Sequence, residues 1–488
     1  MMSNIYITTA IPYVNGAPHI GHACDYLLAD TYARYQKMLG NNVRFQAGTD
    51  EHGNKIAKKA EEQKVDVVEY VNQNSKKFQD FIKKLGVETT DFIRTTDKDH
   101  ERRCREIWKK LKDHIYSATY KGWYCDGCER YVTDKEYEEN KGICPDHNKP
   151  YEELEEENYY FRIADFKEQI RSAIQSGKLK ILPDFRAKEM LALLDDSPDV
   201  SISRPISQLK WGVKVPGDES QVMYVWIDAL SNYITVLGYP DEDISDFWPA
   251  KVQFVGKDIL RFHAIIWPAM LLALGLPLPE TIHSHGHVLS DGKKMSKSIG
   301  NTVDPIEVLN SNGLSAFRYF FLRHIDSFSD SDFTWDKYQA AYNNELANDL
   351  GNLVQRLANL CKKQNLSGLS DYKFELDSEY QETMDSLYFS KAFDYVWEKV
   401  QALNREIDEK KPWEYGKKIK AQIADGNQED ADKLKTELEN ILLELSAKLL
   451  DVSHLLSPFL PEVSERIFAI FTASKIVPPE VPLFPKNN

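Results

Sequence analysis

Hydrophobic and polar positions follow two different periods along this chain. Up to about residue 334, short apolar and β-branched runs are followed by stretches with the 3.6-residue period of an amphipathic helix. Strands that alternate with helices in this way predict an α/β fold with a doubly wound parallel sheet of the Rossmann type. After residue 334 only the helical period continues, which predicts an all-α bundle.

The first predicted strand and helix enclose a turn rich in proline and glycine. Residues 5–9 are apolar and β-branched, residues 12–25 are P-Y-V-N-G-A-P-H-I-G-H-A-C-D, and residues 23–39 follow a helical pattern. His19 and His22 therefore fall at the start of a helix, where unpaired N–H groups and the positive end of the helix dipole favour phosphate. Two histidines in such a segment can also be incidental.

A second strand, residues 43–47, ends in the polar sequence G-T-D-E-H-G at residues 48–53. Ligands of open α/β sheets bind at the carboxyl ends of the strands, so this loop is a candidate for ligand contact. The alternative is that Asp50 caps a helix. Residues 55–85 and 97–117 then follow helical patterns.

Two pairs of metal-binding residue types follow. They are Cys125 with Cys128, and Cys144 with His147. Two tight turns that each offer a pair of soft donors predict one tetrahedral zinc. Four protein ligands leave no open coordination position, so a structural role is expected; a redox dithiol is the alternative for the first pair.

An aromatic stripe follows at residues 222–233, V-M-Y-V-W-I-D-A-L-S-N-Y. An apolar strand is predicted for its first half and a helix for its second. Trp226, Ala229, Leu230 and Tyr233 share one face of that helix. Such a face forms either core or a substrate pocket. His263 lies in an apolar helix that follows another strand, residues 251–255.

Composition restricts the class of protein. The chain has 488 residues, and its 76 acidic against 61 basic residues give a net charge of −15, which is unlike a generic nucleic-acid binder. Six cysteines do not suggest a secreted disulfide scaffold, and no signal peptide is evident. The longest apolar run, residues 264–276, contains a proline and is too short to span a bilayer. We expect a cytoplasmic protein.

H-I-G-H at residues 19–22 and G-K-K-M-S-K-S at residues 292–298 resemble, in that order, the signature pair of the class I aminoacyl-tRNA synthetases. Within that class the chain is similar to the methionyl-tRNA synthetase family. The further matching stretches span nearly the whole chain: A-I-P-Y-V-N-G-A-P-H-I-G-H, G-T-D-E-H-G, the single Cys-Cys-Cys-His knuckle, V-W-I-D-A-L, K-D-I-L-R-F-H, N-D-L-G-N and D-E-K-K-P-W.

This resemblance implies a ligase that works in two steps. Methionine and ATP, with Mg²⁺, form methionyl-adenylate and pyrophosphate, and the methionyl group then passes to the 3′-terminal ribose of tRNA(Met) for translation. The implied catalytic residues are His19, His22, Lys294 and Lys297. The implied ATP-binding residues are His19, Gly21, His22, Lys294, Lys297 and Ser298.

The resemblance also implies where methionine and the anticodon bind. Asp50 would hold the α-ammonium group, and Tyr13 would lie near the sulfur. The full implied methionine set is Ile11, Tyr13, Asp50, Trp226, Ala229, Leu230, Tyr233 and His263. The implied anticodon-binding residues are Asn348, Asn352, Arg356 and Trp413, with the tryptophan as a stacking platform for an unstacked base.

The expected domains follow the same pattern. Residues 1–117 form the first half of the catalytic domain, and residues 118–220 a connective insert with its zinc knuckle in residues 118–150. Residues 221–335 form the second half with the K-M-S-K-S loop, and residues 336–488 an anticodon-binding helical domain. No appended domain of the kind that dimerises some relatives is evident, so we expect a monomer.

Three other functions are compatible with parts of the sequence. A cysteinyl-tRNA synthetase also carries both signatures with zinc, but there the metal binds the substrate and needs an open position. A catalytically idle tRNA-binding protein would not need the intact signature residues His19, His22, Lys294 and Lys297. A nucleotidyltransferase without tRNA would leave the long helical domain unexplained.

Overall fold

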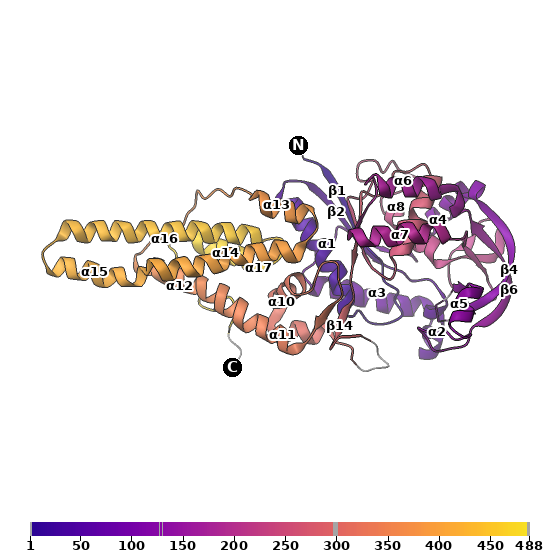
Figure 1. Ribbon diagram of the computed structural model, residues 1–488, viewed down its shortest axis with the longest axis horizontal. Coiled ribbons are helices and arrows are strands. Elements are labelled where there is room, and N and C mark those ends of the chain that lie inside the picture. The colour runs from indigo at the N-terminus through magenta and orange to yellow at the C-terminus, as the bar shows by residue number, and fades with distance from the viewer. Residues whose placement is uncertain (1, 126, 129, 296–300, 486–488) are drawn as a thin grey trace.

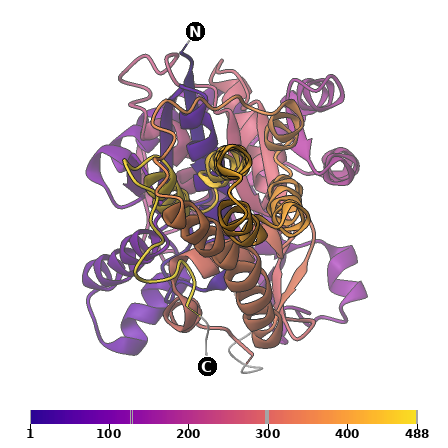
Figure 2. The same ribbon diagram turned by 90° about the vertical axis from the view of Figure 1, so that its left-hand side faces the viewer.

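The molecule consists of a sheet-containing part from which a rod of helices extends (Figure 1). The computed structural model describes residues 2–125, 127–128, 130–295 and 301–485. The C-terminal helices form the rod, and a ribbon of two long strands lies at the opposite end of the molecule (Figure 1). In a view along the rod, the helices of the rod are seen end-on in front of the sheet (Figure 2).

A six-stranded sheet forms the centre of the first part. All its pairings are parallel. Its strands, in spatial order, are β3 (Asp91–Arg94), β2 (Asn42–Thr49), β1 (Asn4–Thr9), β12 (Val252–Gly256), β13 (Thr281–His285) and β7 (Lys180–Leu182). On one side the chain proceeds outward from β1 to β2 and β3, and on the other it proceeds from β12 to β13, beside the earlier strand β7 at the edge. This confirms the predicted doubly wound parallel sheet, with its topological switch point between β1 and β12.

Helices cover the sheet, and two of them differ from the sequence prediction. α1 (Ile20–Met38) follows β1, as predicted. The helical stretch after β2 is two helices, α2 (Asn54–Gln63) and α3 (Val67–Lys84), because Lys64 adopts a left-handed conformation and Asp66 caps the second helix.

The helix predicted for residues 97–117 ends earlier. α4 (Lys98–Lys110) stops because Ile115 begins a long strand, β4 (Ile115–Cys125). Ile115 and the residues after it pair with β6 (Glu152–Phe161) over the whole length of the ribbon. Pairing with a distant segment therefore overrides the local helical pattern.

The ribbon belongs to a four-stranded sheet completed by β5 (Arg130–Val132) and β8 (Val200–Ser201). The helices of this region are α5 (Asp134–Glu139), α6 (Lys167–Gln175) and α7 (Asp184–Asp196). A small sheet of β9 (Ser203–Pro205), β10 (Lys214–Val215) and β11 (Asp218–Met223) follows. The strand predicted near residue 222 thus belongs to this small sheet and not to the central one, whereas β7 from the same region extends the central sheet.

α8 (Val225–Thr235) follows β11, and a π-helical segment, Phe262–Ile266, continues into α9 (Trp267–Ala273). A second three-stranded sheet precedes the rod. It consists of β14 (Val288–Ser290), β15 (Lys293–Lys294) and β16 (Ser331–Phe333). α10 (Pro305–Arg323) runs between β15 and β16, with Asp304 as its N-cap and a kink at Gly313.

The rest of the described chain is helical, as predicted. It contains a π-helical segment, Ala341–Gly351, and the helices α11 (Trp335–Ala340), α12 (Asn352–Lys363), α13 (Ser378–Asp385), α14 (Phe389–Lys410), α15 (Pro412–Ala424), α16 (Gln428–Leu456) and α17 (Pro461–Phe471). No helix within the described ranges is long and apolar enough to cross a membrane.

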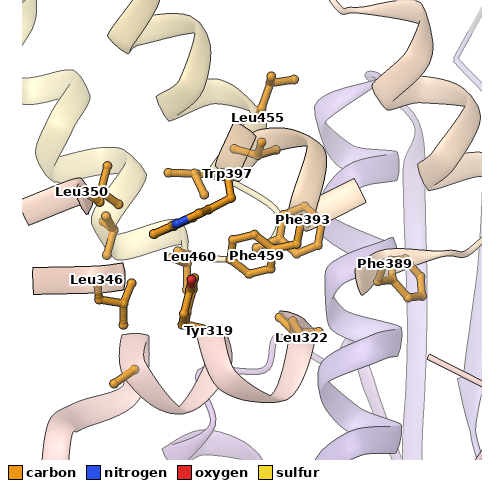
Figure 3. Packing of buried hydrophobic residues seen from close by; sticks show 14 of the residues in the cluster. Tyr319, Leu322, Leu346, Leu350, Phe389, Phe393, Trp397, Leu455, Phe459 and Leu460 are labelled. Atoms are coloured by element: carbon orange, nitrogen blue, oxygen red, sulfur yellow. The ribbon is translucent and has the colours of Figure 1, made fainter. Parts of the chain in front are cut away.

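One hydrophobic core continues from the central sheet into the rod. Tyr319 of α10 lies against two aromatic rings of α14, with its ring centroid 4.7 Å from that of Trp397 and 5.3 Å from that of Phe393 (Figure 3). Because these aromatic contacts cross between α10 and the rod, the helical part cannot move independently without exposing apolar surface to water.

A buried ion pair joins the same parts of the molecule. Arg318 of α10 and Asp30 of α1 are both 1% exposed, with Nη1 and Oδ2 2.8 Å apart. Arg318 also donates to the carbonyl oxygens of Phe459, Pro458 and Leu85, at 2.7, 3.2 and 3.3 Å. One guanidinium therefore connects α1, the end of α3 and the segment before α17.

Replacing Arg318 by Met should destabilise the protein by about 3 kcal/mol or more, because Asp30 would lose a buried counter-ion and three carbonyl groups would lose a donor. Urea unfolding followed by circular dichroism measures this. Lys433→Ala, which removes an exposed ion pair with Glu429 on α16, is the control and should cost less than about 1 kcal/mol. Equal effects of the two substitutions would contradict the role given to Arg318.

Candidate functional site

Two backbone hydrogen bonds join the carboxyl ends of β1 and β2. The N–H of Asp50 donates to the carbonyl of Pro12 at 2.9 Å, and the N–H of Val14 donates to the carbonyl of Asp50 at 3.1 Å. These bonds place Tyr13 directly opposite Asp50. Asp50 is buried, and the N-cap of α2 is Gly53, so the alternative that Asp50 caps this helix is excluded.

Gly53 and Gly48 leave room for two side chains of the predicted methionine set. At Gly53, where φ is +117°, a Cβ atom would lie 2.8 Å from the hydroxyl of Tyr13. At Gly48, a Cβ atom would lie 2.9 Å from a methyl group of Ile11. A larger residue at Gly53 would displace Tyr13, and one at Gly48 would clash first with the backbone of Ile93 and then with Ile11.

His19 and His22 form the start of α1. His19 is the N-cap, its Nδ1 accepts from the N–H of Gly21 at 3.1 Å, and its own N–H donates to Nδ1 of His22 at 3.1 Å. The two rings stack with centroids 3.7 Å apart. Burial and the neighbouring His19 hold the pKa of His22 well below its usual range.

The hydrogen bonds also determine the tautomers of these histidines. Because Nδ1 accepts a hydrogen bond in each ring, the proton of each neutral imidazole lies on Nε2. Two Nε2–H donors therefore lie at the positive end of the α1 helix dipole. This is a set of donors suited to the oxygen atoms of a phosphate.

The predicted methionine residues on α8 and beyond lie together around two contacts. Tyr233 donates its hydroxyl to Nε2 of His263 at 2.7 Å, while Nδ1 of His263 donates to the carbonyl of Ile259 at 3.0 Å. Burial lowers the pKa of His263 to about 4, so this ring is neutral near pH 7. Trp226 stacks on Phe262 with centroids 3.7 Å apart and an interplanar angle of 10°.

Ala229 and Leu230, both buried, lie on the same helix as Trp226 and Tyr233. Phe262 is a residue that the sequence analysis missed. Its position directly before His263, in the stretch K-D-I-L-R-F-H, was the available signal, but only the fold shows that it pairs with Trp226.

The two residues after Asp50, Glu51 and His52, are buried, and each is held in place by side chains from other elements. Glu51 forms a double hydrogen bond with Arg94 of β3, at 2.7 and 2.8 Å, and its carbonyl accepts from the indole N–H of Trp211 at 2.6 Å. His52 lies 2.6 Å from Asp228 of α8. Glu51 and His52, which the sequence offered with Asp50 as ligand contacts, are thus engaged by the protein itself.

The pairing of His52 with Asp228 links the two groups of predicted methionine residues. One group, containing Tyr13 and Asp50, lies at the ends of β1 and β2. The other, containing Trp226, lies on α8, which has Asp228 in its first turn.

Charged groups that the sequence did not predict lie near the start of α1. Nε2 of His285, at the end of β13, is 2.7 Å from Asp25 of α1. Although burial alone would lower it, the Asp25 carboxylate raises the pKa of His285 to about 9. Asp258, just after β12, has its pKa lowered to about 2 by the neighbouring His287.

Lys294 is exposed on β15, which pairs with β14 next to the central sheet. Its carbonyl accepts from the side-chain amide of Asn301 at 3.2 Å. Lys297 and Ser298, the other predicted residues of this loop, lie outside the described residues.

The four predicted zinc ligands come together at the end of the β4–β6 ribbon. The donor atoms of Cys125, Cys128, Cys144 and His147 all lie within 4.8 Å of one another. Sγ of Cys128 is 3.5 Å from Sγ of Cys144 and 3.4 Å from Nδ1 of His147. Ligand atoms of a tetrahedral zinc with bonds of about 2.0–2.3 Å lie roughly 3.5 Å apart, so this cluster fits the metal.

Gly127 makes this geometry possible. A Cβ atom there would lie 2.4 Å from the ring of His147, so a larger residue would push the imidazole away from the three thiols.

The predicted anticodon residues lie at one region of the rod. The side-chain amide of Asn352 donates to that of Asn348 at 3.4 Å, and both residues are exposed. Arg356 forms an ion pair of 2.8 Å with Asp408 near the end of α14. Trp413, in the first turn of α15, is 45% exposed. The sequence did not predict that Arg356 already has a carboxylate partner.

The parallel sheet, the histidine pair at the first helix and the Cys-Cys-Cys-His cluster fit one class of protein, the class I aminoacyl-tRNA synthetases. A family model described as tRNA synthetases class I (M) matches residues 5–153 and 147–358. The chain belongs to the methionyl-tRNA synthetase family, as the resemblance of its motifs predicted.

Relatives and solved structures agree with this assignment. The methionine--tRNA ligase of Thermotoga maritima is 38% identical over 95% of this chain and 74% of its own length, and that of Listeria monocytogenes 39% identical over 96% and 72%. A structure of Mycobacterium tuberculosis methionyl-tRNA synthetase with methionyl-adenylate matches 99% of this chain and 100% of its own, with 31% identity and a TM-score of 0.89. Its apo form matches 100% and 99%, with 28% identity and a TM-score of 0.83.

Proposed function

We propose that both steps of methionine ligation take place at the switch point of the central sheet. In the first step, the carboxylate of methionine attacks the α-phosphorus of ATP, and pyrophosphate leaves. In the second, a hydroxyl of the terminal ribose of tRNA(Met) attacks the carbonyl carbon of the adenylate, and AMP leaves. The observation that carries this proposal is the pair of Nε2–H donors at the start of α1, on the same segment that places Tyr13 against Asp50.

At the phosphate end, His19, Gly21 and His22 bind ATP. The neutral imidazoles donate through Nε2 to phosphate oxygens, and the N–H groups of the helix start add their partial positive charge. Lys294 and Lys297 neutralise the charge that develops on the leaving pyrophosphate, and Ser298 donates its hydroxyl to a phosphate oxygen. Mg²⁺ bound with ATP would supply further neutralisation of the phosphates.

At the amino-acid end, the buried carboxylate of Asp50 pairs with the α-ammonium group. Tyr13, Trp226, Tyr233 and His263 surround the flexible thioether, which makes favourable contacts with aromatic rings. The remaining predicted members of this pocket, which supply apolar surface, are Ile11, Ala229 and Leu230. The neutral His263 suits this role because it adds no charge to an apolar pocket.

For the tRNA, Trp413 offers an exposed aromatic surface on which an anticodon base can stack. Asn348 and Asn352 supply amide groups on the neighbouring exposed surface. Arg356 can contact a base only if its ion pair with Asp408 opens or is shared.

The zinc cluster has a structural role in this proposal. Four protein ligands complete the tetrahedron, so no position is open for a substrate thiol, and this disfavours the cysteinyl alternative. The proposed enzyme acts as a monomer, and light scattering that gives twice the chain mass would contradict this.

In ATP–pyrophosphate exchange, methionine should support exchange, while cysteine, leucine and isoleucine should not. Exchange with cysteine instead would contradict both the pocket and the zinc assignment. No exchange with any of them, from folded protein with Mg²⁺, would favour the idle tRNA-binding alternative.

The same assay tests Lys294. Lys294→Ala should lower the exchange rate about 10²-fold, because one cation would be lost from the charge that develops toward pyrophosphate. Lys293→Ala is a matched control, because neighbouring residues of β15 point to opposite faces. Equal losses in both variants would contradict a direct role of Lys294.

Trp413→Ala should lower kcat/KM for charging of tRNA(Met) about 10-fold or more, with exchange unchanged, because only the stacking surface for a base is lost. Ile423→Ala, which truncates a residue 53% exposed on the same helix, is the control. A loss of exchange with W413A, or wild-type charging, would contradict the anticodon assignment.

Metal analysis of the purified protein should give one zinc per chain. Cys144→Ser should lose it, and the region of β5 and α5 should become sensitive to protease, because structural zinc sites contribute folding free energy. Cys361→Ser, a buried cysteine in the rod, should keep the metal. A metal-free wild-type protein with full exchange activity would contradict the proposal.

A further inference from the structure

Four buried residues behind the predicted methionine pocket form a connected network. They are His52 after β2, His100 and Cys104 of α4, and Asp228 of α8, and we call them the Asp228 network. Oδ2 of Asp228 is 2.6 Å from Nδ1 of His52, and Oδ1 is 2.8 Å from Nε2 of His100. Sγ of Cys104 is 3.3 Å from the same nitrogen of His100. The aspartate side chain is 1% exposed and the two histidine side chains 3% and 1%.

The pair of His52 and Asp228 is ionic. Burial alone would lower the pKa of His52, yet the Asp228 carboxylate raises it to about 10. Burial alone would raise the pKa of Asp228, yet the two histidines hold it well below its usual range. An isolated buried carboxylate would be strongly disfavoured, so each member of the pair depends on the other.

The geometry favours hydrogen bonds over a bound metal. His100, Cys104 and Asp228 could in principle offer three ligand atoms to one ion. However, a nitrogen and an oxygen bound at about 2.0–2.1 Å to a tetrahedral zinc would lie roughly 3.3 Å apart. The observed 2.8 Å is the length of a direct hydrogen bond, and the other oxygen of Asp228 is occupied by His52.

The network lies between the two groups of predicted methionine residues. Asp228 is two residues from Trp226 and one from Ala229, on the helix that forms the pocket wall. His52 is two residues from Asp50, the predicted partner of the α-ammonium group. Glu51, between them, is held on the other side by Arg94.

We propose that Asp228 is a positioning residue for methionine: through His52 it fixes the carboxylate of Asp50 relative to the pocket wall on α8. This inference rests on the proposed function. Methionine must contact both groups, with its ammonium at Asp50 and its thioether between Tyr13 and Trp226, so the separation of the groups determines whether these contacts form together. ATP is proposed to bind at the start of α1, a different helix from those that carry Asp228, His100 and Cys104.

A displacement of about 1 Å in such a contact can cost about 10²-fold in rate or affinity. Asp228→Asn should therefore raise KM for methionine about 10- to 100-fold in the exchange assay. KM for ATP should stay within about twofold of wild type.

Two substitutions of His52 separate positioning from a merely structural role. His52→Asn places an amide N–H near the position of Nδ1 and can still donate to Asp228, whereas His52→Gln places its amide near Nε2 and cannot. H52N should therefore raise KM for methionine several-fold less than H52Q. This pair also carries the test if D228N does not fold.

Asp241→Asn is the matched control. Asp241 accepts from Arg102 and Arg103 of the same helix, α4, but it lies at the surface and away from Asp50. D241N should leave both KM values near those of wild type.

Equal changes in KM for methionine and for ATP, or equal effects of H52N and H52Q, would overturn the proposal. So would a second metal ion per chain that is lost in Cys104→Ser while the zinc of the knuckle remains. A wild-type protein without methionine-dependent exchange would instead contradict the proposed function itself, so the two failures are distinguishable.

Discussion

The backbone pairing of Pro12 and Val14 with Asp50 is the constraint on which the site depends. It extends the contact of β1 and β2 beyond the end of the sheet, next to the switch point between β1 and β12. The segment that follows β1 must therefore turn toward α1, which brings the His19–His22 pair to the same edge. The topology therefore places phosphate donors and a buried carboxylate at one edge of the sheet.

A second constraint fixes the position of this edge of the sheet relative to the rod. The signature helix α1 is held by Asp30 to Arg318, and Arg318 in turn holds the backbone before α17. Because the hydrophobic core is continuous across the same boundary, the rod is a rigid extension of the catalytic part (Figures 1 and 3). A tRNA that contacts Trp413 would then be presented to the site in one fixed orientation.

The sequence predicted those features that local patterns determine. The strand–turn–helix around His19, the zinc ligand pairs and the helical periodicity after residue 334 all depend on neighbouring residues. It could not predict the partners of Glu51, His52 and Arg356, because each partner is distant in the sequence and is a common charged residue. The early end of α4 was missed for the same reason: pairing with a distant strand decides it.

The central claim is that methionine spans the two groups of residues at the switch point. A crystal structure of the protein with methionine tests it most directly. The account predicts the α-ammonium nitrogen within hydrogen-bond distance of the Asp50 carboxylate and the thioether between Tyr13 and Trp226, with the methionine carboxylate directed toward the start of α1. Methionine bound elsewhere, or with its ammonium group away from Asp50, would contradict the account.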